Sequence, residues 1–378
     1  MIDKVSLSAQ WLEEKRKKYK KDPGIIEGMI HALYLLDQLK LTGLDFIFKG
    51  GTSLVLLMER PLRFSVDIDI IVKPELTREV LESYLKKIIA SSEFRKLELD
   101  EKRSYKEGIP KAHYKFIYRS NVSNRNKEGH IIANPDREIL LDVLFADNPY
   151  PVLLEREIKT EWTVMTGDPL TVMTPDINSI AGDKLVAFAP TTTGVPYGRE
   201  KEKEIIKQLF DVGNLFPLID NMEVFIKSYN SSAASEIKYR PERNIVSIED
   251  ILNDTIATGI IIASREFHAA DDTDSKTMYS EINKGVNQFS HFVFEGSFRI
   301  DHAQVASARA AYLAAVILMG FKEKLEIFDE NIPLQEYLIN HPEYNFLNKR
   351  LKFVAKGEAL FYWHRTLKLL YPENPSQT

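Results

Sequence analysis

Two aspartates separated by one apolar residue constrain this chain more than any other feature. Asp67 and Asp69 stand in the segment RFSVDIDIIV, where apolar residues alternate with acids. This period of two predicts a β-strand. Residues i and i+2 of a strand point to the same face, so the two carboxylates would lie side by side. Like charges this close repel unless a cation lies between them. The segment therefore predicts either a metal platform or a solvent-facing edge strand that carries acids.

A glycine pair precedes the aspartates. The segment FIFKGGTSLVLLMER predicts a short strand, a turn at Gly50 and Gly51, and a helix. A helix N-terminus presents unpaired N–H groups, and glycine has no Cβ that would keep a phosphate away from the backbone. The turn is therefore either a phosphate-binding loop or only a tight connection. It is not a P-loop, because G-x-x-x-x-G-K-[ST] is absent.

A third carboxylate stands alone in an apolar strand pattern. Asp142 lies within ILLDVLF, and a buried carboxylate without a partner is costly. A neighbouring metal or base would explain it. Mg²⁺ prefers oxygen ligands, usually one or two carboxylates together with substrate phosphates. Three acids on adjacent strands beside a phosphate-binding turn predict phosphoryl or nucleotidyl transfer, in which two metals stabilise the attacking and leaving oxygens.

These motifs resemble a known family. KGGTSL followed by RFSVDIDI is similar to the hallmark KGGT-[SA]-L…R-x-S-x-D-x-D of the AbiEii/AbiGii toxin branch of the DNA polymerase β-like nucleotidyltransferases. Asp142 falls where this branch has its third strand carboxylate. AGDKL at 181–185 and KQLFDV at 207–212 resemble its A-x-K-L and D-L-Y-D-L helices, with Gln208 where many members have an aspartate. The resemblance covers about residues 25–220.

The resemblance implies a fold and a set of catalytic residues. We expect an α+β chain, in which a polymerase β-like nucleotidyltransferase domain (a mixed sheet with helices) is followed by a mostly helical C-terminal domain. Asp67 and Asp69 would hold Mg²⁺ or Mn²⁺, and Asp142 would bind one metal or activate the acceptor hydroxyl. Lys184 either meets a phosphate oxygen or is a lysine that snorkels to the surface. Asp211 either acts in the site or is an exposed helix acid.

The predicted nucleotide-binding residues surround the glycine turn and include one lysine of a later strand, HYKFIYRS. The backbone of the turn and one serine hydroxyl would contact the triphosphate, while an arginine and a second serine either bind nucleotide or orient the turn. The strand lysine is a further candidate for a phosphate contact, and the sequence leaves its role open. The full set is Lys49, Gly50, Gly51, Thr52, Ser53, Arg63, Ser65 and Lys115.

Composition excludes several other chemistries. The chain has no cysteine, which rules out disulfides, zinc–thiolate sites, Fe–S clusters and a cysteine nucleophile. Its eight histidines are scattered and HExxH is absent, which argues against a histidine metal site. The longest apolar stretch, at 310–321, is shorter than the roughly 20 residues of a membrane span. The first residues lack the apolar core of a signal peptide, so we expect a cytoplasmic protein.

We place a domain boundary after residue 165. Residues 1–165 would form the catalytic domain with its N-terminal helices, and residues 166–378 the helical domain, whose first helices at about 174–216 complete the active site. The pattern becomes mostly helical after Pro151. An apolar run at 303–321 predicts a core helix.

Two basic clusters are candidate contacts to an acceptor RNA. The first, at 15–21, binds phosphate or is the solvated face of a helix. The second, at 348–368, interleaves basic residues with aromatics and either stacks on single-stranded RNA or forms an amphipathic helix that packs its aromatics inward.

Three functions compete. The first is a Mg²⁺-dependent nucleotidyltransferase toxin that transfers NMP from an NTP to an acceptor. The resemblance suggests a tRNA 3′ end, with a protein hydroxyl as the other option and a cognate antitoxin as partner. The second is a small-molecule, antibiotic-type nucleotidyltransferase. The third is a nucleotide-binding protein without transfer activity, against which the intact Asp67, Asp69 and Asp142 argue. None of the three needs a membrane.

Overall fold

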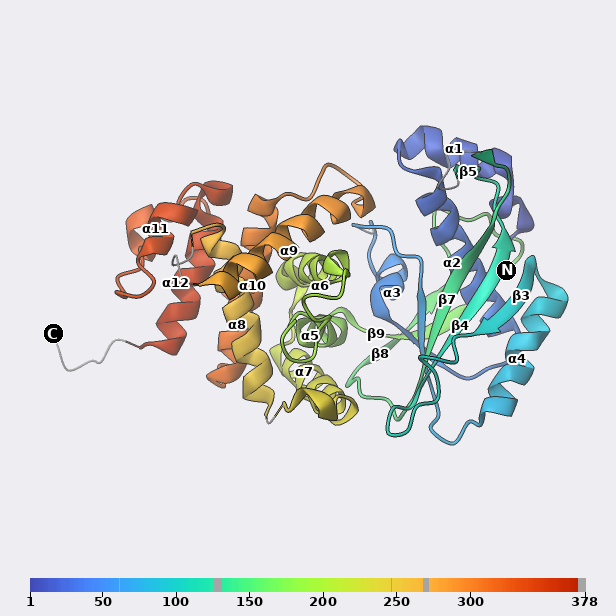
Figure 1. Ribbon diagram of the computed structural model, residues 1–378, viewed down its shortest axis with the longest axis horizontal. Coiled ribbons are helices and arrows are strands. Elements are labelled where there is room, and N and C mark those ends of the chain that lie inside the picture. Colours follow the sequence, from blue (N-terminus) through green and yellow to red (C-terminus); the bar gives the residue numbers. More distant parts are fainter. Residues whose placement is uncertain (61, 126–130, 246, 268–271, 373–378) are drawn as a thin grey trace. The chain divides into compact units, whose positions relative to one another are not determined.

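The chain divides into two units that are described separately. The computed structural model describes residues 1–60, 62–125, 131–245, 247–267 and 272–372. The first unit comprises Met1–Asp176 and His291–Gly296, and the second comprises Ile177–Ser290 and Ser297–Thr378 (Figure 1).

A seven-stranded mixed sheet forms the centre of the first unit, in the order β3-β4-β7-β2-β1-β9-β8. The neighbours β2 and β7 are parallel, as are β1 and β9, and the other pairs are antiparallel. Together with its helices, this sheet confirms the predicted α+β class. The strands are β1 Ile47–Lys49, β2 Ile68–Val72, β3 Phe94–Leu99, β4 Lys111–Arg119, β7 Asp136–Phe145, β8 Leu153–Glu157 and β9 Thr171–Pro175, with a separate hairpin of β5 Asn124–Arg125 and β6 Ile131–Ile132.

Helices cover one face of this sheet. Helix α2 packs against β2 and β7, and α4 packs against β3. Helix α2 starts at Pro23, because the Asp22 side chain accepts hydrogen bonds from the N–H groups of Gly24 and Ile25 and proline suits the first turn of a helix. The helices of this unit are η1 Lys4–Leu7, α1 Ala9–Tyr19, α2 Pro23–Leu41, α3 Gly50–Leu57 and α4 Arg78–Ser91.

The other face of the sheet is polar. Along β4, alternate residues Ala112, Tyr114 and Phe116 are buried, while His113 and Lys115 between them are half-buried. The same alternation in β7 buries Ile139, Leu141 and Val143 and leaves Asp142 half-buried on the other face, between the half-buried Leu140 and Leu144. A strand buried on only one side shows this period of two. Any chemistry carried by the sheet therefore belongs to the face opposite α2.

A short return segment completes the first unit. Residues 291–296 come back from the second unit and pair with the chain before β2: Phe64 N donates to Phe292 O at 2.8 Å, and Phe294 N donates to Leu62 O at 3.0 Å. The Phe294 ring lies 4.0 Å from that of Phe64 and 5.1 Å from that of Trp162. This aromatic cluster fixes the segment that leads into the two aspartates.

The second unit is helical, as predicted. At its centre is α10, the predicted core helix, which packs against α6, α8 and α12. Its buried face is rich in alanine, and Gly213 of α6 approaches so closely that an added Cβ would lie 2.5 Å from the Cβ of Ala306. The helices are α5 Ile177–Ala187, α6 Glu202–Leu215, α7 Met222–Tyr239, α8 Ile248–Ser264, α9 Thr273–Phe289, α10 Ile300–Leu318, α11 Phe346–Leu351 and α12 Glu358–Leu370, with 3₁₀ turns η2 Phe216–Leu218, η3 Pro241–Arg243, η4 Ser290–Phe292, η5 Leu334–Tyr337 and η6 Val354–Gly357.

The expectation of a helical pattern directly after Pro151 is wrong. Strands β8 and β9 follow Pro151 and extend the sheet beyond β1, so the first unit runs to Asp176. Strand β8 is an edge strand, LLERE, whose last three residues are exposed, and therefore it lacks an apolar face that a sequence pattern could reveal. Of the helices in the described part of the chain, none is long and apolar enough to cross a membrane.

A buried histidine in α2 should make the first unit sensitive to acid. His31 stacks on Tyr118 with ring centroids 3.7 Å apart, and burial lowers its pKa to about 4. Between pH 6.5 and 4 the unfolded chain binds a proton that the folded chain excludes, so stability falls with pH by about 3 kcal/mol in total. Above pH 6.5 this contribution is constant. Urea unfolding of wild type and His31→Gln across this range measures it; equal slopes for both proteins would contradict the assignment.

Candidate active site

Close approach of two side chains explains the glycine pair. Gly50, the first residue of α3, has φ +77°, and a Cβ added to it would lie 2.2 Å from Asp69 Oδ2. A Cβ on Gly51 would lie 2.2 Å from a guanidinium nitrogen of Arg63. Neither position can accept a side chain without displacing these groups. The turn is thus shaped around the predicted site residues Asp69 and Arg63.

Hydrogen bonds tie the turn to the aspartate segment. Thr52 Oγ1 lies 2.8 Å from Ser65 Oγ and 2.5 Å from the backbone oxygen of Asp67, and both side chains are buried. Ser53 Oγ donates to Gly50 O at 2.8 Å inside the first turn of α3, and Arg63 donates to Phe64 O at 3.0 Å. Thr52 and Ser65 therefore hold the loop and the aspartate segment together, while the Ser53 bond stays within the first turn of α3 and the Arg63 bond goes to the adjacent residue.

The aspartates lie on a central strand. Strand β2 has β7 on one side and β1 on the other, so the edge-strand interpretation of its acids is wrong. Asp69 pairs in register with Asp142 of parallel β7 and with Lys49 of antiparallel β1. Residues in register on adjacent strands share a face, and this is the polar face opposite α2. Asp67 directly precedes β2 and is half-buried.

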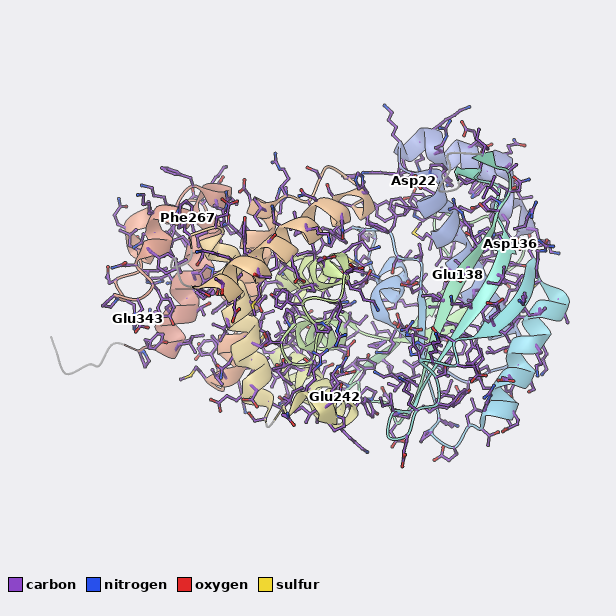
Figure 2. All side chains as sticks on the ribbon, viewed as in Figure 1. Asp22, Asp136, Glu138, Glu242, Phe267 and Glu343 are labelled. Carbon is purple, nitrogen blue, oxygen red and sulfur yellow. The ribbon has the colours of Figure 1, made fainter. Side chains whose placement is uncertain are left out.

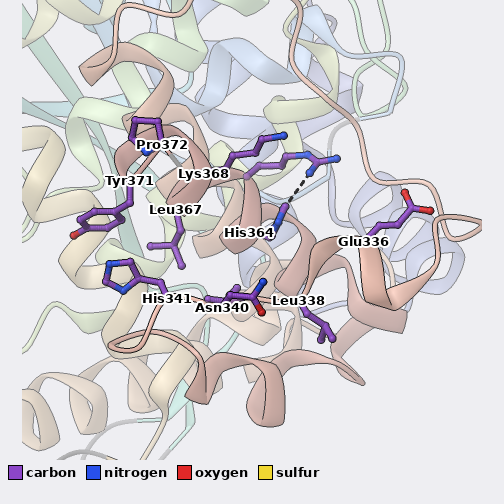
Figure 3. Close-up of a pocket in the computed structure, with 11 residues that line it drawn as sticks. Glu336, Leu338, Asn340, His341, His364, Leu367, Lys368, Tyr371 and Pro372 are labelled. Carbon is purple, nitrogen blue, oxygen red and sulfur yellow. Dashed lines mark hydrogen bonds between the residues drawn. The ribbon is translucent and has the colours of Figure 1, made fainter. Parts of the chain in front are cut away.

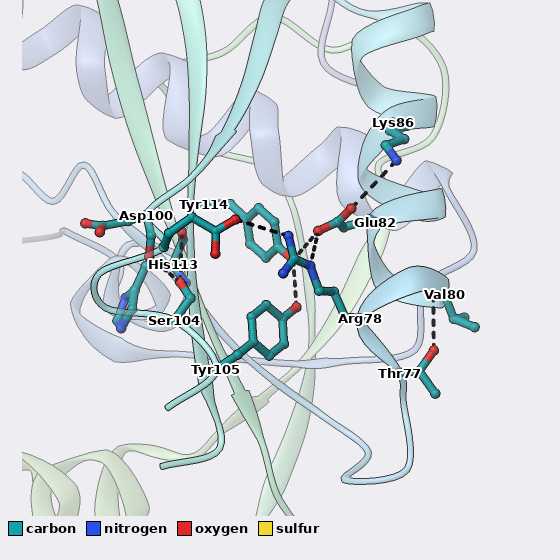
Figure 4. Close-up of polar contacts among 11 residues, drawn as sticks. Thr77, Arg78, Val80, Glu82, Lys86, Asp100, Ser104, Tyr105, His113 and Tyr114 are labelled. Atoms are coloured by element: carbon teal, nitrogen blue, oxygen red, sulfur yellow. Dashed lines mark hydrogen bonds and ion pairs between the residues drawn. The ribbon is translucent and has the colours of Figure 1, made fainter. Parts of the chain in front are cut away.

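One residue of the site escaped the sequence analysis. His113 of β4 pairs in register with Asp142, and its Nδ1 lies 2.5 Å from Asp142 Oδ1. The His113 backbone N–H donates to Ser104 Oγ at 2.9 Å (Figure 4). The alternation of HYKFIY places His113 on the same face as the predicted Lys115, which was the signal available. The sequence left a metal or a base open as the neighbour of Asp142, and the structure places a histidine in contact with this carboxylate.

Lys115 lies further along the same face. Its Nζ pairs with Glu138 Oε2 of β7 at 3.0 Å, and both side chains are partly exposed. Glu138 is labelled on the sheet of the first unit in Figure 2. Beside it, on the helix-covered face, Tyr114 OH lies 2.7 Å from Tyr105 OH, and Arg78 pairs with Glu82 at 2.8 Å (Figure 4). Tyr114 OH also donates to Glu82 Oε1 of α4 at 3.4 Å, which links β4 to α4, while Lys115 lies on the opposite face of the strand.

The carboxylate oxygens of the three aspartates are ligands that suit a hard cation. Asp69 and Asp142 are half-buried register neighbours, and Asp67 lies two residues from Asp69. Mg²⁺ commonly takes one or two carboxylates and completes its shell with water and substrate phosphates. Among the described residues no group of three or more acids or histidines is assembled as a metal site. Asp69 and Asp142 match the one or two carboxylates that such an ion takes.

The remaining predicted catalytic residues meet in the second unit. Lys184 Nζ of α5 lies 2.9 Å from Asp211 Oδ2 of α6 and donates to Gln208 Oε1 at 3.0 Å. Only 7% of the Lys184 side chain and 2% of the Asp211 side chain are exposed. The alternatives of a surface lysine and an exposed helix acid are therefore both wrong. A buried ion pair of this kind marks either a functional site or a structural link between α5 and α6.

The N-terminal basic cluster is largely occupied by contacts within its own unit. On α1, Arg16 pairs with Glu13 at 2.7 Å and Lys18 with Glu161 at 2.8 Å. Lys15 is buried, donates to the backbone of Glu161 and lies 4.3 Å above the ring of Trp11. These contacts favour the alternative of a helix face over that of an RNA site.

The aromatic residues of the C-terminal cluster mostly pack inward. Phe361, Tyr362 and Trp363 of α12 are buried, in agreement with an amphipathic helix. The cluster is not one helix, because Ala355 and Lys356 adopt left-handed backbone angles between α11 and α12. The turn leaves Phe353 83% exposed.

Comparison with known proteins decides the family. A sequence profile described as nucleotidyl transferase AbiEii toxin, type IV TA system, matches residues 34–289. The chain belongs to the AbiEii family. It is therefore a nucleotidyltransferase of the toxin type, as the motifs predicted, and this family implies an NTP substrate and an antitoxin partner. The AbiEii match includes both the aspartate strand and the Lys184–Asp211 pair.

Other comparisons add little to the AbiEii assignment. A structure search finds an antigenic nucleotidyltransferase-like protein from Paracoccidioides brasiliensis, with 13% identity and a TM-score of 0.32, over 57% of this chain and 89% of that chain. Among curated proteins no match is found.

Proposed function

We propose that this AbiEii-family protein transfers NMP from an NTP to the 3′ end of a tRNA, using Mg²⁺. One observation carries the proposal: the register that sets Asp69 beside Asp142, on the face where the glycine turn of α3 begins. Carboxylates next to free helix N–H groups can serve a cation and a triphosphate together. An NTP carries a triphosphate and binds a divalent cation through it, so one molecule would occupy both parts of this site.

Each residue has a role in this proposal. Asp67, Asp69 and Asp142 would hold the cation, which supplies charge stabilisation at the transferred phosphorus and at the leaving pyrophosphate. The backbone N–H groups of Gly51 and Thr52 would bind triphosphate oxygens at the start of α3. His113 would orient Asp142 through its 2.5 Å contact.

Four further cationic side chains would assist nucleotide binding. Lys49 is the register neighbour of Asp69, and Arg63 lies against Gly51. Lys184 would meet a phosphate oxygen of the nucleotide, and its ammonium group lies 2.9 Å from Asp211 Oδ2. Lys115 is on the face of Asp142 and would contact a phosphate beyond the site. Transfer forms a bond from the 3′ oxygen of the acceptor to the α-phosphorus and breaks the bond to pyrophosphate.

The test is a labelling reaction with all partners defined. The protein is incubated with each of the four α-³²P-labelled NTPs, Mg²⁺ and total tRNA, and label is followed on denaturing gels. We expect label on tRNA with at least one NTP, and none with EDTA or with periodate-oxidised tRNA, whose 3′ hydroxyls are destroyed. If protein, or an aminoglycoside supplied in parallel, carries the label, then that molecule and not tRNA is the acceptor. Absence of label on every acceptor would refute transfer.

A further inference from the structure

A cleft near the end of the chain is unused by the proposed chemistry. Its volume is about 650 Å³, within the usual range of ligand-binding pockets. One wall is α12 with the residues that follow it, and the other is the segment from η5 to His341 (Figure 3). The lining residues are Glu336, Leu338, Ile339, Asn340, His341, His364, Arg365, Leu367, Lys368, Tyr371 and Pro372.

The α12 wall presents positive charge and hydrogen-bond donors. His364 and Lys368 lie one turn apart on α12, and Tyr371 directly follows the end of the helix. Lys368 is exposed, and no ion pair is recorded for it in the part of the chain that the structure describes. Arg365 is held in place, with Nε 2.8 Å from Glu326 and its guanidinium carbon 4.6 Å from the Phe361 ring centre. The chain has a net charge of −5, but on this wall the exposed Lys368 contributes a positive charge.

The opposite end of the cleft is aromatic. Tyr371 is 44% exposed, and its ring lies 4.4 Å from that of His341 and 5.9 Å from that of Tyr344. Its hydroxyl lies 3.3 Å from Tyr344 OH, which steadies the ring. Asn340, on the same wall as His341, is exposed and makes no recorded side-chain hydrogen bond among the described residues.

We infer that this cleft binds a nucleotide unit of single-stranded RNA. A supported, exposed ring is a stacking platform for a base, and an unpaired lysine one helical turn away meets the phosphate. The Asn340 amide can donate to and accept from a base edge. The cleft would thus hold one nucleotide of the acceptor strand. This inference rests on the proposed function in one respect only, that the acceptor is RNA.

A basic side chain and an aromatic ring stand at two sides of the same cleft, and this arrangement favours RNA over other ligands. A membrane surface would need a continuous apolar patch beside the basic residues, whereas here Lys368 and Tyr371 flank a concave site. Free NTP shares the same chemistry, so the experiment includes it as a separate arm.

The experiment measures RNA binding directly, by fluorescence anisotropy of a short labelled single-stranded RNA on the full chain. Tyr371→Ala should raise Kd roughly tenfold or more, the usual loss for one stacked base, while Tyr371→Phe keeps wild-type affinity. Lys368→Glu should weaken binding and lower the slope of log Kd against log salt by about 0.7. Lys238→Glu, an exposed lysine on α7 outside the cleft, is the control and should change neither. ATP binding should be unchanged in all variants.

The outcomes separate this inference from the proposed function. Wild-type RNA affinity and salt slope in both Tyr371→Ala and Lys368→Glu would overturn the cleft, whatever the transfer assay shows. Loss of ATP binding together with RNA binding, at unchanged thermal stability, would also overturn it, because the cleft would then be a site for free nucleotide. Failure of the wild type to label tRNA, with cleft-dependent RNA binding intact, would refute only the proposed acceptor reaction.

Discussion

Asp67→Ala and Asp69→Ala should each abolish nucleotidyl transfer and leave the protein folded. Each substitution removes an oxygen ligand from a cation that must stabilise charge on the transferred phosphate, which costs several kcal/mol of barrier, about a thousandfold in rate or more. Stability should not fall, because Asp69 stands beside Asp142 and losing one of two neighbouring like charges relieves repulsion. Single-turnover transfer and thermal unfolding measure the two effects.

The matched control is an acid on the same face of the sheet. Glu138 of β7 is partly exposed and pairs with Lys115 rather than with a predicted metal ligand. Glu138→Ala should therefore retain most of the transfer activity. Wild-type rates in both aspartate variants would remove the catalytic interpretation of this face, and equal losses in Glu138→Ala would show a general electrostatic effect instead.

Lys184→Ala should both destabilise the second unit and impair use of the NTP. It breaks the buried pair of Lys184 with the Asp211 carboxylate, whose side chain is only 2% exposed, and breaking a buried pair by removing one partner costs about 3–5 kcal/mol. Nucleotide affinity should also fall at temperatures where the variant is still folded, while the carboxylate cluster of the first unit is unaffected. Urea unfolding and NTP titration provide the readouts.

A double variant separates the two roles of Lys184. Lys184→Met with Asp211→Leu removes both charges and fills the space, and such replacements are commonly neutral for stability. We expect stability close to wild type with turnover still lost. Recovery of turnover along with stability would make the pair purely structural, and unchanged stability in Lys184→Ala would contradict the buried pairing.

The core of the site could be predicted because its parts are close together in sequence. The glycine turn, the aspartates and the strands around them lie within residues 46–72, and each has a local pattern. The contact between His113 and Asp142 depends on the register of two strands separated by a long connection. No local signal encodes that register. The histidine therefore emerged only when the sheet was assembled.

Elements with little apolar patterning were also missed. Strand β3 has two exposed charged residues after its first position, and β8 is an edge strand with a charged end, so neither shows the alternation of a half-buried strand. The break between α11 and α12 depends on Ala355 and Lys356 in left-handed conformations, which neither residue type favours. Gly357 directly after them was the one indication of a turn.

The return of residues 291–296 to the first unit limits where the gene can be truncated or recombined. Its catalytic half is not a contiguous stretch of the gene: Phe292 and Phe294, encoded more than a hundred codons after β9, complete the wall against which Phe64 and Trp162 pack. A recombination event or a stop codon between β9 and that segment would leave those rings facing water. Exchange of the helical half between relatives must therefore preserve this short aromatic stretch, which ties the inheritance of the two halves together.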